Sequence, residues 1–360
     1  MFTSSKNCDE TSAEVRHNHT AGFTILELVV AMTIFLVVSG AVFGLLKVAS
    51  QSKSSVSEST GLNKNVRLAL NLIGRDAYNA GFSYPLKNTV IASDNRISTL
   101  LGIPFDVDTT RDTVPPIIAG NNITVNTWNT ATGVRTDQVT FLFKDNTFNL
   151  VGTGANAVST SLNINAATTN TGGIDEIVPI SGSNSVCRVN DLYLITGNTG
   201  STLGVSTALN GTDRVQFQNS DALNLNQSGP SGPIRAITLP ASMQRVLMVT
   251  YFVTADGTLT RRDYVNRLPS AAFVDEPLVY GVEDLQIRYV MDDSSVVDNP
   301  SSGPDGIAGT ADDTQSNLAA VRQIRFTVSV RSLELNQANQ PYRQTMTATF
   351  STRNLGYDAN

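Results

Sequence analysis

Residues 23–46 read FTILELVVAMTIFLVVSGAVFGLL, an almost unbroken apolar run in which Glu27 is the single ionisable residue. A helix of this length reaches about 36 Å, because each residue adds about 1.5 Å. The hydrocarbon core of a bilayer is about 30 Å thick, so the run is long enough to cross a membrane. A carboxylate at that depth costs about 2.5–3.5 kcal/mol on insertion scales, and Glu27 therefore needs a partner or a function.

A counter-charge for Glu27 arises if the chain is cut between Gly22 and Phe23. Phe23 would then carry a free α-amino group, which is cationic near neutral pH, and Glu27 lies one helical turn further along. Within one chain, the carboxylate would meet the unpaired N–H groups and the positive dipole end of the helix. Between chains, it would pair with the Phe23 amine of a neighbouring subunit and fix the axial register of the two helices.

The segment Gly22-Phe23-Thr24-Ile25-Leu26-Glu27, followed by the apolar run, resembles the processing site of type IV prepilins and the related secretion pseudopilins. The resemblance implies that a membrane-embedded prepilin peptidase cleaves after Gly22 and N-methylates Phe23, and that Glu27 acts in assembly. Residues 1–22 would be a cytoplasmic leader, since they contain no apolar region of their own. This leader is longer and more mixed in charge than in many prepilins. An ordinary signal anchor, with Glu27 near the interface, is the alternative interpretation.

Composition argues against an enzyme and against a nucleic-acid partner. The formal charge is −6, and removal of residues 1–22 takes away two basic and three acidic side chains, which leaves −5. No basic surplus favours nucleic acid. His17, His19 and Cys8 all lie in the leader, so the mature chain has no histidine and one cysteine, Cys187. It therefore lacks the usual general base and cannot form an internal disulfide, and Cys187 is expected to be a small buried hydrophobe.

The apolar run is expected to continue as a helix over 23–81, of which 23–46 would span the membrane. Beyond a Ser- and Lys-rich stretch, apolar residues recur at intervals of three and four, which places them on one helical face. They are Leu62, Val66, Ala69, Leu70, Ile73 and Ala77. Gly81 can end the helix in the left-handed conformation. A kink or partial melting is expected between Ser50 and Gly61.

The rest of the chain is predicted to be β structure. In residues 82–240, short apolar runs separated by Thr, Asn, Ser and Gly predict strands in a loop-rich head region. In residues 241–360, Asp256-Gly257 predicts a hairpin between 245–254 and 258–265, and further strand regions are expected at 278–290, 321–332 and 345–352. These antiparallel strands can cover one flank of the helix. The predicted fold class is therefore α+β, pilin-like, with an elaborated β-rich middle region.

Two parts of the chain also resemble PilW-type minor pilins. They are the end of the long helix, from Arg67 to Phe82, and the segments around Tyr251–Arg262, Gly281–Tyr289 and Val321–Phe326. Together with the N-terminal segment, the resemblance covers about half of the chain. Residues between these parts carry none.

An acidic, glycine-containing loop near residue 305 has two interpretations. Carboxylates interleaved with glycine suit Ca²⁺, which takes six to eight oxygen ligands on a backbone that can turn sharply. Asp305, Asp312 and Asp313 are the preferred candidate ligands, although their spacing does not follow the EF-hand rule. The alternative is a solvated acidic loop. No other cofactor is required.

These features predict a structural subunit of the inner membrane, with a single span and an ectodomain outside the cytoplasm. The favoured function is a minor pilin that initiates a type IV pilus or forms its tip, with prepilin peptidase and other major and minor pilins as partners. A head of this size would be hard to repeat at every step of a thin fibre. The alternatives are a J-type pseudopilin of a type II secretion system and a pilus-tip adhesin or DNA-capture subunit.

Overall fold

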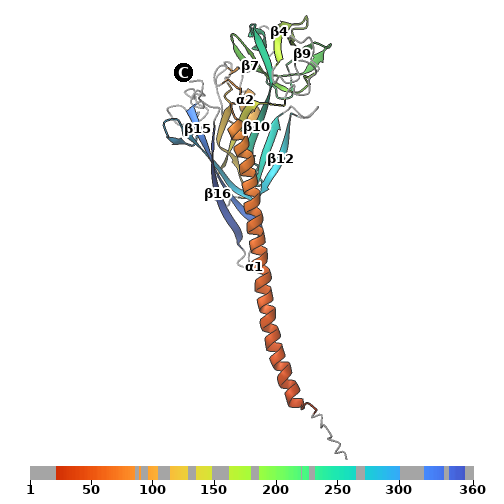
Figure 1. Cartoon of the computed structure of the whole chain (residues 1–360), viewed down its shortest axis with the longest axis vertical. Coiled ribbons are helices and arrows are strands. Elements are labelled where there is room, and N and C mark those ends of the chain that lie inside the picture. Colours follow the sequence, from red (N-terminus) through yellow and green to blue (C-terminus); the bar gives the residue numbers. More distant parts are fainter. Residues whose placement is uncertain are drawn as a thin grey trace, which may run out of the picture. The chain divides into compact units, whose positions relative to one another are not determined.

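A computed structural model describes twelve ranges of the chain: 22–85, 89–90, 96–103, 114–128, 135–147, 162–179, 186–219, 221–226, 232–264, 272–300, 320–335 and 340–352. The chain divides into two compact units, residues 1–57 and 58–360. Helix α1 (Ile25–Asn79) contributes to both (Figure 1).

Helix α1 is helical at every residue from Ile25 to Asn79. The expected melting between Ser50 and Gly61 is therefore wrong, because Gly61 and the serines lower helix propensity by too little to interrupt so long a helix. Its end is as predicted. Gly81 has a φ of 78°, the left-handed value that glycine adopts without strain, and its N–H bonds to the carbonyl of Leu142.

The C-terminal part of α1 buries the predicted face in the main core of the second unit. Val66, Ile73 and Ala77 have no exposed surface, and Ala69 and Leu70 are also buried. Strand residues from two different sheets, such as Phe141 and Phe326, pack in the same core. The α+β prediction, with a long helix packed on antiparallel strands, is confirmed.

The larger sheet has twelve strands, most of them from the middle of the chain. A short helix, α2 (Arg96–Leu101), precedes most of these strands and packs in a second core. The strands are β1 (Thr89–Val90), β2 (Ile117–Val125), β3 (Arg135–Lys144), β4 (Leu162–Thr169), β5 (Asp175–Pro179), β6 (Leu192–Gly197), β7 (Gly200–Val205), β8 (Ala208–Asn210), β9 (Arg214–Phe217), β10 (Ala241–Val253), β11 (Thr258–Tyr264) and β12 (Phe273–Tyr280).

Strand β10 joins the two halves of this sheet. Its first residues pair with β4 and β6, whereas Val246–Tyr251 pair with β3 and Met248–Val253 pair with β11. The predicted hairpin is present, with Gly257 at a φ of 77° in the turn. β10 begins at Ala241, directly after the limit predicted at residue 240, and that division of the chain stays a prediction.

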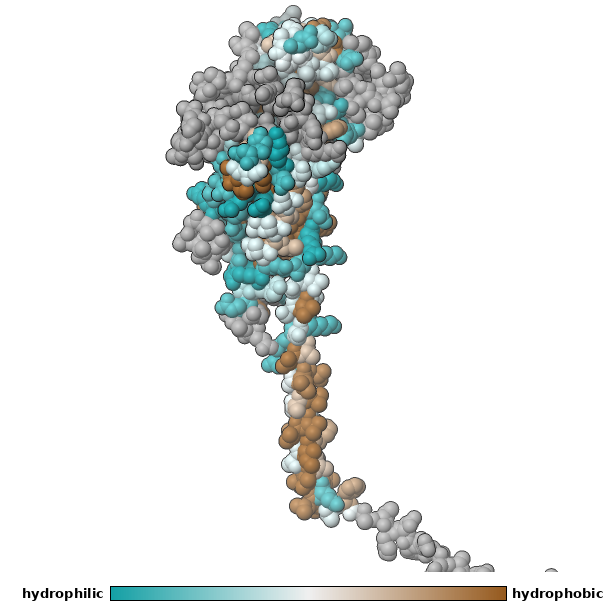
Figure 2. All heavy atoms as spheres, turned by 60° about the vertical axis from the view of Figure 1, so that its left-hand side comes forward, coloured by the Kyte–Doolittle hydropathy of each residue, from teal (hydrophilic) through white to brown (hydrophobic). Residues whose placement is uncertain are grey.

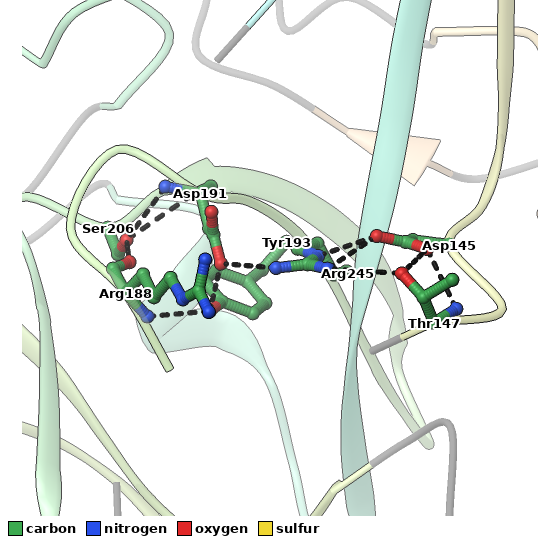
Figure 3. A network of polar contacts seen from close by, with 7 residues as sticks. All are labelled: Asp145, Thr147, Arg188, Asp191, Tyr193, Ser206 and Arg245. Atoms are coloured by element: carbon green, nitrogen blue, oxygen red, sulfur yellow. Dashed lines mark hydrogen bonds and ion pairs between the residues drawn. The ribbon is translucent and has the colours of Figure 1, made fainter. Parts of the chain in front are cut away.

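A buried polar network fixes this junction (Figure 3). Arg245 of β10 binds Asp145, which follows β3, with 2.6 Å between Nη2 and Oδ2. Its Nη1 lies 3.2 Å from Oδ2 of Asp191, at the start of β6, and that oxygen also accepts a hydrogen bond from Tyr193. Both carboxylates are almost fully buried. Removing Arg245 would leave two buried carboxylates without their cation, which is strongly destabilising.

The smaller sheet has the order β14-β13-β15-β16 and packs on the same core as α1. Its strands are β13 (Val282–Met291), β14 (Val296–Val297), β15 (Val321–Leu335) and β16 (Pro341–Ser351). The prediction of a single strand region at 278–290 is wrong. Gly281, with a φ of 78°, separates β12 from β13, so the chain leaves one sheet and enters the other at that residue.

Two buried carboxylates, Asp76 and Asp137, link α1 and the two sheets. The buried Asp76 of α1 accepts a hydrogen bond of 2.7 Å from the hydroxyl of Tyr251 in β10 and one of 3.3 Å from Nε of Arg261 in β11. Asp137 of β3 accepts hydrogen bonds from the backbone N–H groups of Asn122 and Ile287. Since Ile287 belongs to β13, Asp137 links the larger sheet to the smaller one.

Candidate processing and assembly site

The predicted processing and assembly residues lie at the beginning of α1. Gly22, Phe23 and Thr24 are not helical, and α1 begins at Ile25. The side chain of Phe23 is 87% exposed. The peptide bond between Gly22 and Phe23 therefore lies in a non-helical, exposed segment directly before the helix.

Glu27 is held by a reciprocal capping interaction with Thr24. The backbone N–H and the hydroxyl of Thr24 each donate a hydrogen bond of 3.0 Å to Oε2 of Glu27. In return, the backbone N–H of Glu27 donates a bond of 3.2 Å to the hydroxyl of Thr24. This is a capping box, in which an N-terminal Thr and an acidic residue three positions later satisfy each other's N–H groups.

Sequence reasoning anticipated that Glu27 would meet unpaired N–H groups of its own helix but did not single out Thr24. The signal was present, because a Thr followed three residues later by a Glu at the start of an apolar run is the sequence pattern of a capping box. The capping box orients the carboxylate at the first turn, where it keeps acceptor capacity for a further donor.

The helix that follows this site is apolar and exposed within its own unit. Its large side chains from Ile25 to Val48 are about half or more exposed, and Figure 2 shows them as a hydrophobic surface along this part of α1. By length and composition, α1 is able to cross a membrane. Such a surface is stable only in lipid or against other apolar helices.

The other residues singled out from the sequence are the candidate calcium ligands and Cys187. Asp305, Asp312 and Asp313 lie outside the described residues, so the calcium site stays a prediction. Within the described ranges, no group of three or more His, Cys, Asp or Glu side chains is arranged to hold a metal ion. Cys187 is buried, as predicted, and burial raises the pKa of its thiol to about 12, which makes it unreactive near neutral pH.

Comparison with known families supports the interpretation of the N-terminal segment. Residues 17–43 match the family model of the prokaryotic N-terminal methylation motif. The match includes Gly22, Phe23, Thr24 and Glu27 together with most of the apolar run. No curated protein gives a significant match to the chain.

The motif and the fold together define the class of the molecule. The chain carries the N-terminal methylation motif that is typical of type IV prepilin-like proteins, and a pilin-like arrangement of helix and sheets follows it. Such a protein is a structural subunit and not an enzyme. The motif does not distinguish subunits of type IV pili from those of type II secretion pseudopili. It indicates a protein of this kind, and such subunits are processed by prepilin peptidase and anchored in the inner membrane before assembly.

Proposed function

We propose that this protein is a minor pilin of the PilW type, a low-abundance subunit that initiates a type IV pilus or forms its tip. Cleavage between Gly22 and Phe23 would release residues 1–22, and Phe23 would be N-methylated. The observation that carries the proposal is the methylation-motif match, which extends from before α1 into the apolar, exposed first part of that helix.

Glu27 would act in assembly through its charge. In the bilayer, the capping box of Thr24 offsets part of the cost of burying the carboxylate. In the fibre, the α-amino group of Phe23 of a neighbouring subunit would supply the counter-charge. The exposed surface of the apolar helix would then be buried between subunits, which offsets its extraction from lipid.

The size of the head favours a minor subunit over a major one. The described strands after residue 82 form two sheets, and a head of up to 279 residues is difficult to repeat at each step of a thin fibre. A J-type pseudopilin would share the N-terminal features. Deletion of the gene separates the two: loss of pili with secretion intact supports the minor pilin, whereas loss of secretion with pili intact contradicts it.

Mass spectrometry of the mature N-terminus tests the processing step. In cells with an active prepilin peptidase, the chain is expected to begin at Phe23 with an added methyl group. Gly22→Val should block cleavage, because a branched side chain replaces the hydrogen next to the scissile bond. Gly44→Val is the matched control, since a Cβ at Gly44 meets nothing within 4 Å, and it should be processed normally. Wild-type chains that still begin upstream of Gly22 would contradict the proposal.

A further inference from the structure

The capping box at the start of α1 uses the same N–H groups that a longer helix would need. In an α-helix each N–H bonds to the carbonyl four residues earlier. Extension of α1 towards its N-terminus would therefore pair the N–H of Glu27 with the carbonyl of Phe23. In the structure, that N–H is bonded at 3.2 Å to the hydroxyl of Thr24 instead. The hydroxyl therefore competes directly with the first hydrogen bond of an extended helix.

The carbonyl of Gly22 would be the next acceptor if the helix grew by one more residue. Its donor would be the N–H of Leu26, four residues later. Gly22 supplies the acyl side of the proposed scissile bond, and hydrolysis adds water across that bond to leave a carboxylate on Gly22 and an amine on Phe23. A carbonyl within a helix is hydrogen-bonded and flanked by the adjacent turn, so the helix would have to unwind before cleavage.

An apolar environment strengthens the tendency of a helix to extend. The first N–H groups of a helix have no partner within it, and lipid offers no water to bind them. The carbonyls of the preceding residues are then the nearest acceptors. The capping box removes this driving force, because Oε2 of Glu27 accepts the N–H of Thr24 and the hydroxyl of Thr24 accepts that of Glu27. Gly22 only lowers helix propensity, which satisfies neither N–H.

We propose that Thr24 is a positioning residue for processing. By capping α1, which begins at Ile25, its hydroxyl keeps the Gly22–Phe23 bond in the non-helical segment before the helix, where prepilin peptidase binds it. This inference rests on the proposed cleavage at that bond and adds the side chain that controls access to it. Two substitutions separate the hydroxyl from the shape of the side chain. Ser retains the capping hydroxyl, whereas Val has nearly the shape of Thr and lacks it.

Cleavage of the purified full-length chain by prepilin peptidase in detergent tests the proposal. Loss of a cap changes the stability of a helix start by a factor of about five. Thr24→Val should therefore raise KM about fivefold and leave kcat unchanged, because only the chains with a non-helical segment bind the enzyme. Thr24→Ser and Glu27→Gln keep the capping bonds and should have the wild-type KM. Cleavage is slowed and not abolished, so the Thr24 variants still mature.

Nuclear magnetic resonance with selective labels reports the helix start without the enzyme. The sequence contains two Gly-Phe steps, Gly22-Phe23 and Gly81-Phe82. Isotopic labelling of glycine carbonyl carbons and phenylalanine nitrogens therefore gives one correlated signal for the scissile carbonyl and one for that of Gly81, which is an internal control. In Thr24→Val, expressed without the peptidase, the Gly22 signal should move downfield towards helical values while the Gly81 signal stays fixed.

Three results would overturn the inference. They are a wild-type KM for Thr24→Val, a Gly22 carbonyl signal that does not move in that variant, and an equal rise of KM in Thr24→Ser, since the hydroxyl would then not be the cause. A wild-type chain that the peptidase does not cleave between Gly22 and Phe23 would instead contradict the proposed function. The two failures are therefore distinguishable in the same set of measurements.

Discussion

Two roles of Glu27 can be separated at the level of single residues, since its carboxylate both caps its own helix and supplies a charge. Gln also serves at the third position of a capping box, whereas it has no charge. The capping bonds of Thr24 should therefore survive in Glu27→Gln while the pairing with a neighbouring α-amino group is lost.

Glu27→Gln is thus expected to be inserted and processed like the wild type but to fail in assembly. Thr24→Ala removes the capping hydroxyl and keeps the charge, so it should weaken the start of the helix by about 1 kcal/mol and still assemble. Subunit incorporation into sheared fibres, measured beside N-terminal methylation, checks both outcomes. Normal incorporation of Glu27→Gln would show that the charge is not needed.

Asp137 makes the stability of the head depend on pH. Burial raises the pKa of this carboxyl to about 6, and the hydrogen bonds from Asn122 and Ile287 only partly oppose that effect. The negative charges of Asp284 and Asp298 raise it further. Because the folded-state pKa lies above the unfolded value, the folded head binds the proton more tightly. The resulting stability is fully present below about pH 4 and is lost as the pH rises through about 6.

We therefore expect the free energy of unfolding to fall by about 2 kcal/mol between pH 4 and pH 7 relative to Asp137→Asn, which cannot titrate. Guanidinium unfolding of residues 58–360 at several pH values measures the difference, since this fragment contains all three hydrophobic cores. Parallel pH profiles for the two proteins would exclude Asp137 as the cause.

At the scale of elements, the contact between α1 and β16 depends on a glycine. A Cβ at Gly74 would lie 2.3 Å from Cε1 of Phe350, a distance that real side chains do not tolerate. A Cβ at Gly61 of the same helix meets nothing within 4 Å. The two glycines thus have opposite roles, since Gly74 permits close packing and Gly61 only lowers helix propensity.

Gly74→Ala is expected to destabilise the protein by about 1–3 kcal/mol through overpacking. Gly61→Ala should stabilise it by about 0.5–1 kcal/mol, because alanine loses less backbone freedom in a helix. Thermal unfolding of the full-length protein in detergent compares the two variants. Phe350→Leu should recover part of the loss in Gly74→Ala, and destabilisation that persists in the double variant would point to another cause.

Helix and strand periodicity predicted much of the architecture at this scale. The buried face of α1 and the alternation of Ile324, Phe326 and Val328 follow from side-chain spacing, and the hairpin follows from the turn signal Asp256-Gly257. The division at Gly281 could not be predicted, because a glycine in an apolar run does not show that its two flanks pair with different sheets. Thr24 was likewise not predicted as a site residue, because the capping-box pattern is short: a Thr followed three residues later by a Glu.

At the scale of the whole head, β10 makes the two halves of the larger sheet interdependent. Its 13 residues pair with β3, β4, β6 and β11, and Arg245 ties it to carboxylates beside β3 and β6. If β10 leaves, the strands β3, β4, β6 and β11 each lose a hydrogen-bonded neighbour. Non-local contacts of this kind favour a single cooperative transition.

The fragment 58–360 has one built-in probe in each half. Trp128 packs on Gly257 and Arg331, and Cys187 is buried in the core of the other half. We expect the fluorescence of Trp128 and the accessibility of the Cys187 thiol to change with the same guanidinium midpoint. Labelling of Cys187 at a lower concentration than the fluorescence change would indicate that the halves unfold independently.

The hydrogen bonds that Asp76 accepts from Tyr251 and Arg261 also determine where a mechanical force on α1 would reach the head. A pull on the N-terminal part of α1 travels along the helix backbone, and Asp76 is the residue at which that backbone is bonded to β10 and β11. The force is then distributed over many backbone hydrogen bonds of the sheet, and the helix is not separated from the sheet one turn at a time. In a subunit held under traction by its anchor, this carboxylate and the buried apolar face of α1 would together resist separation of the helix from the sheets.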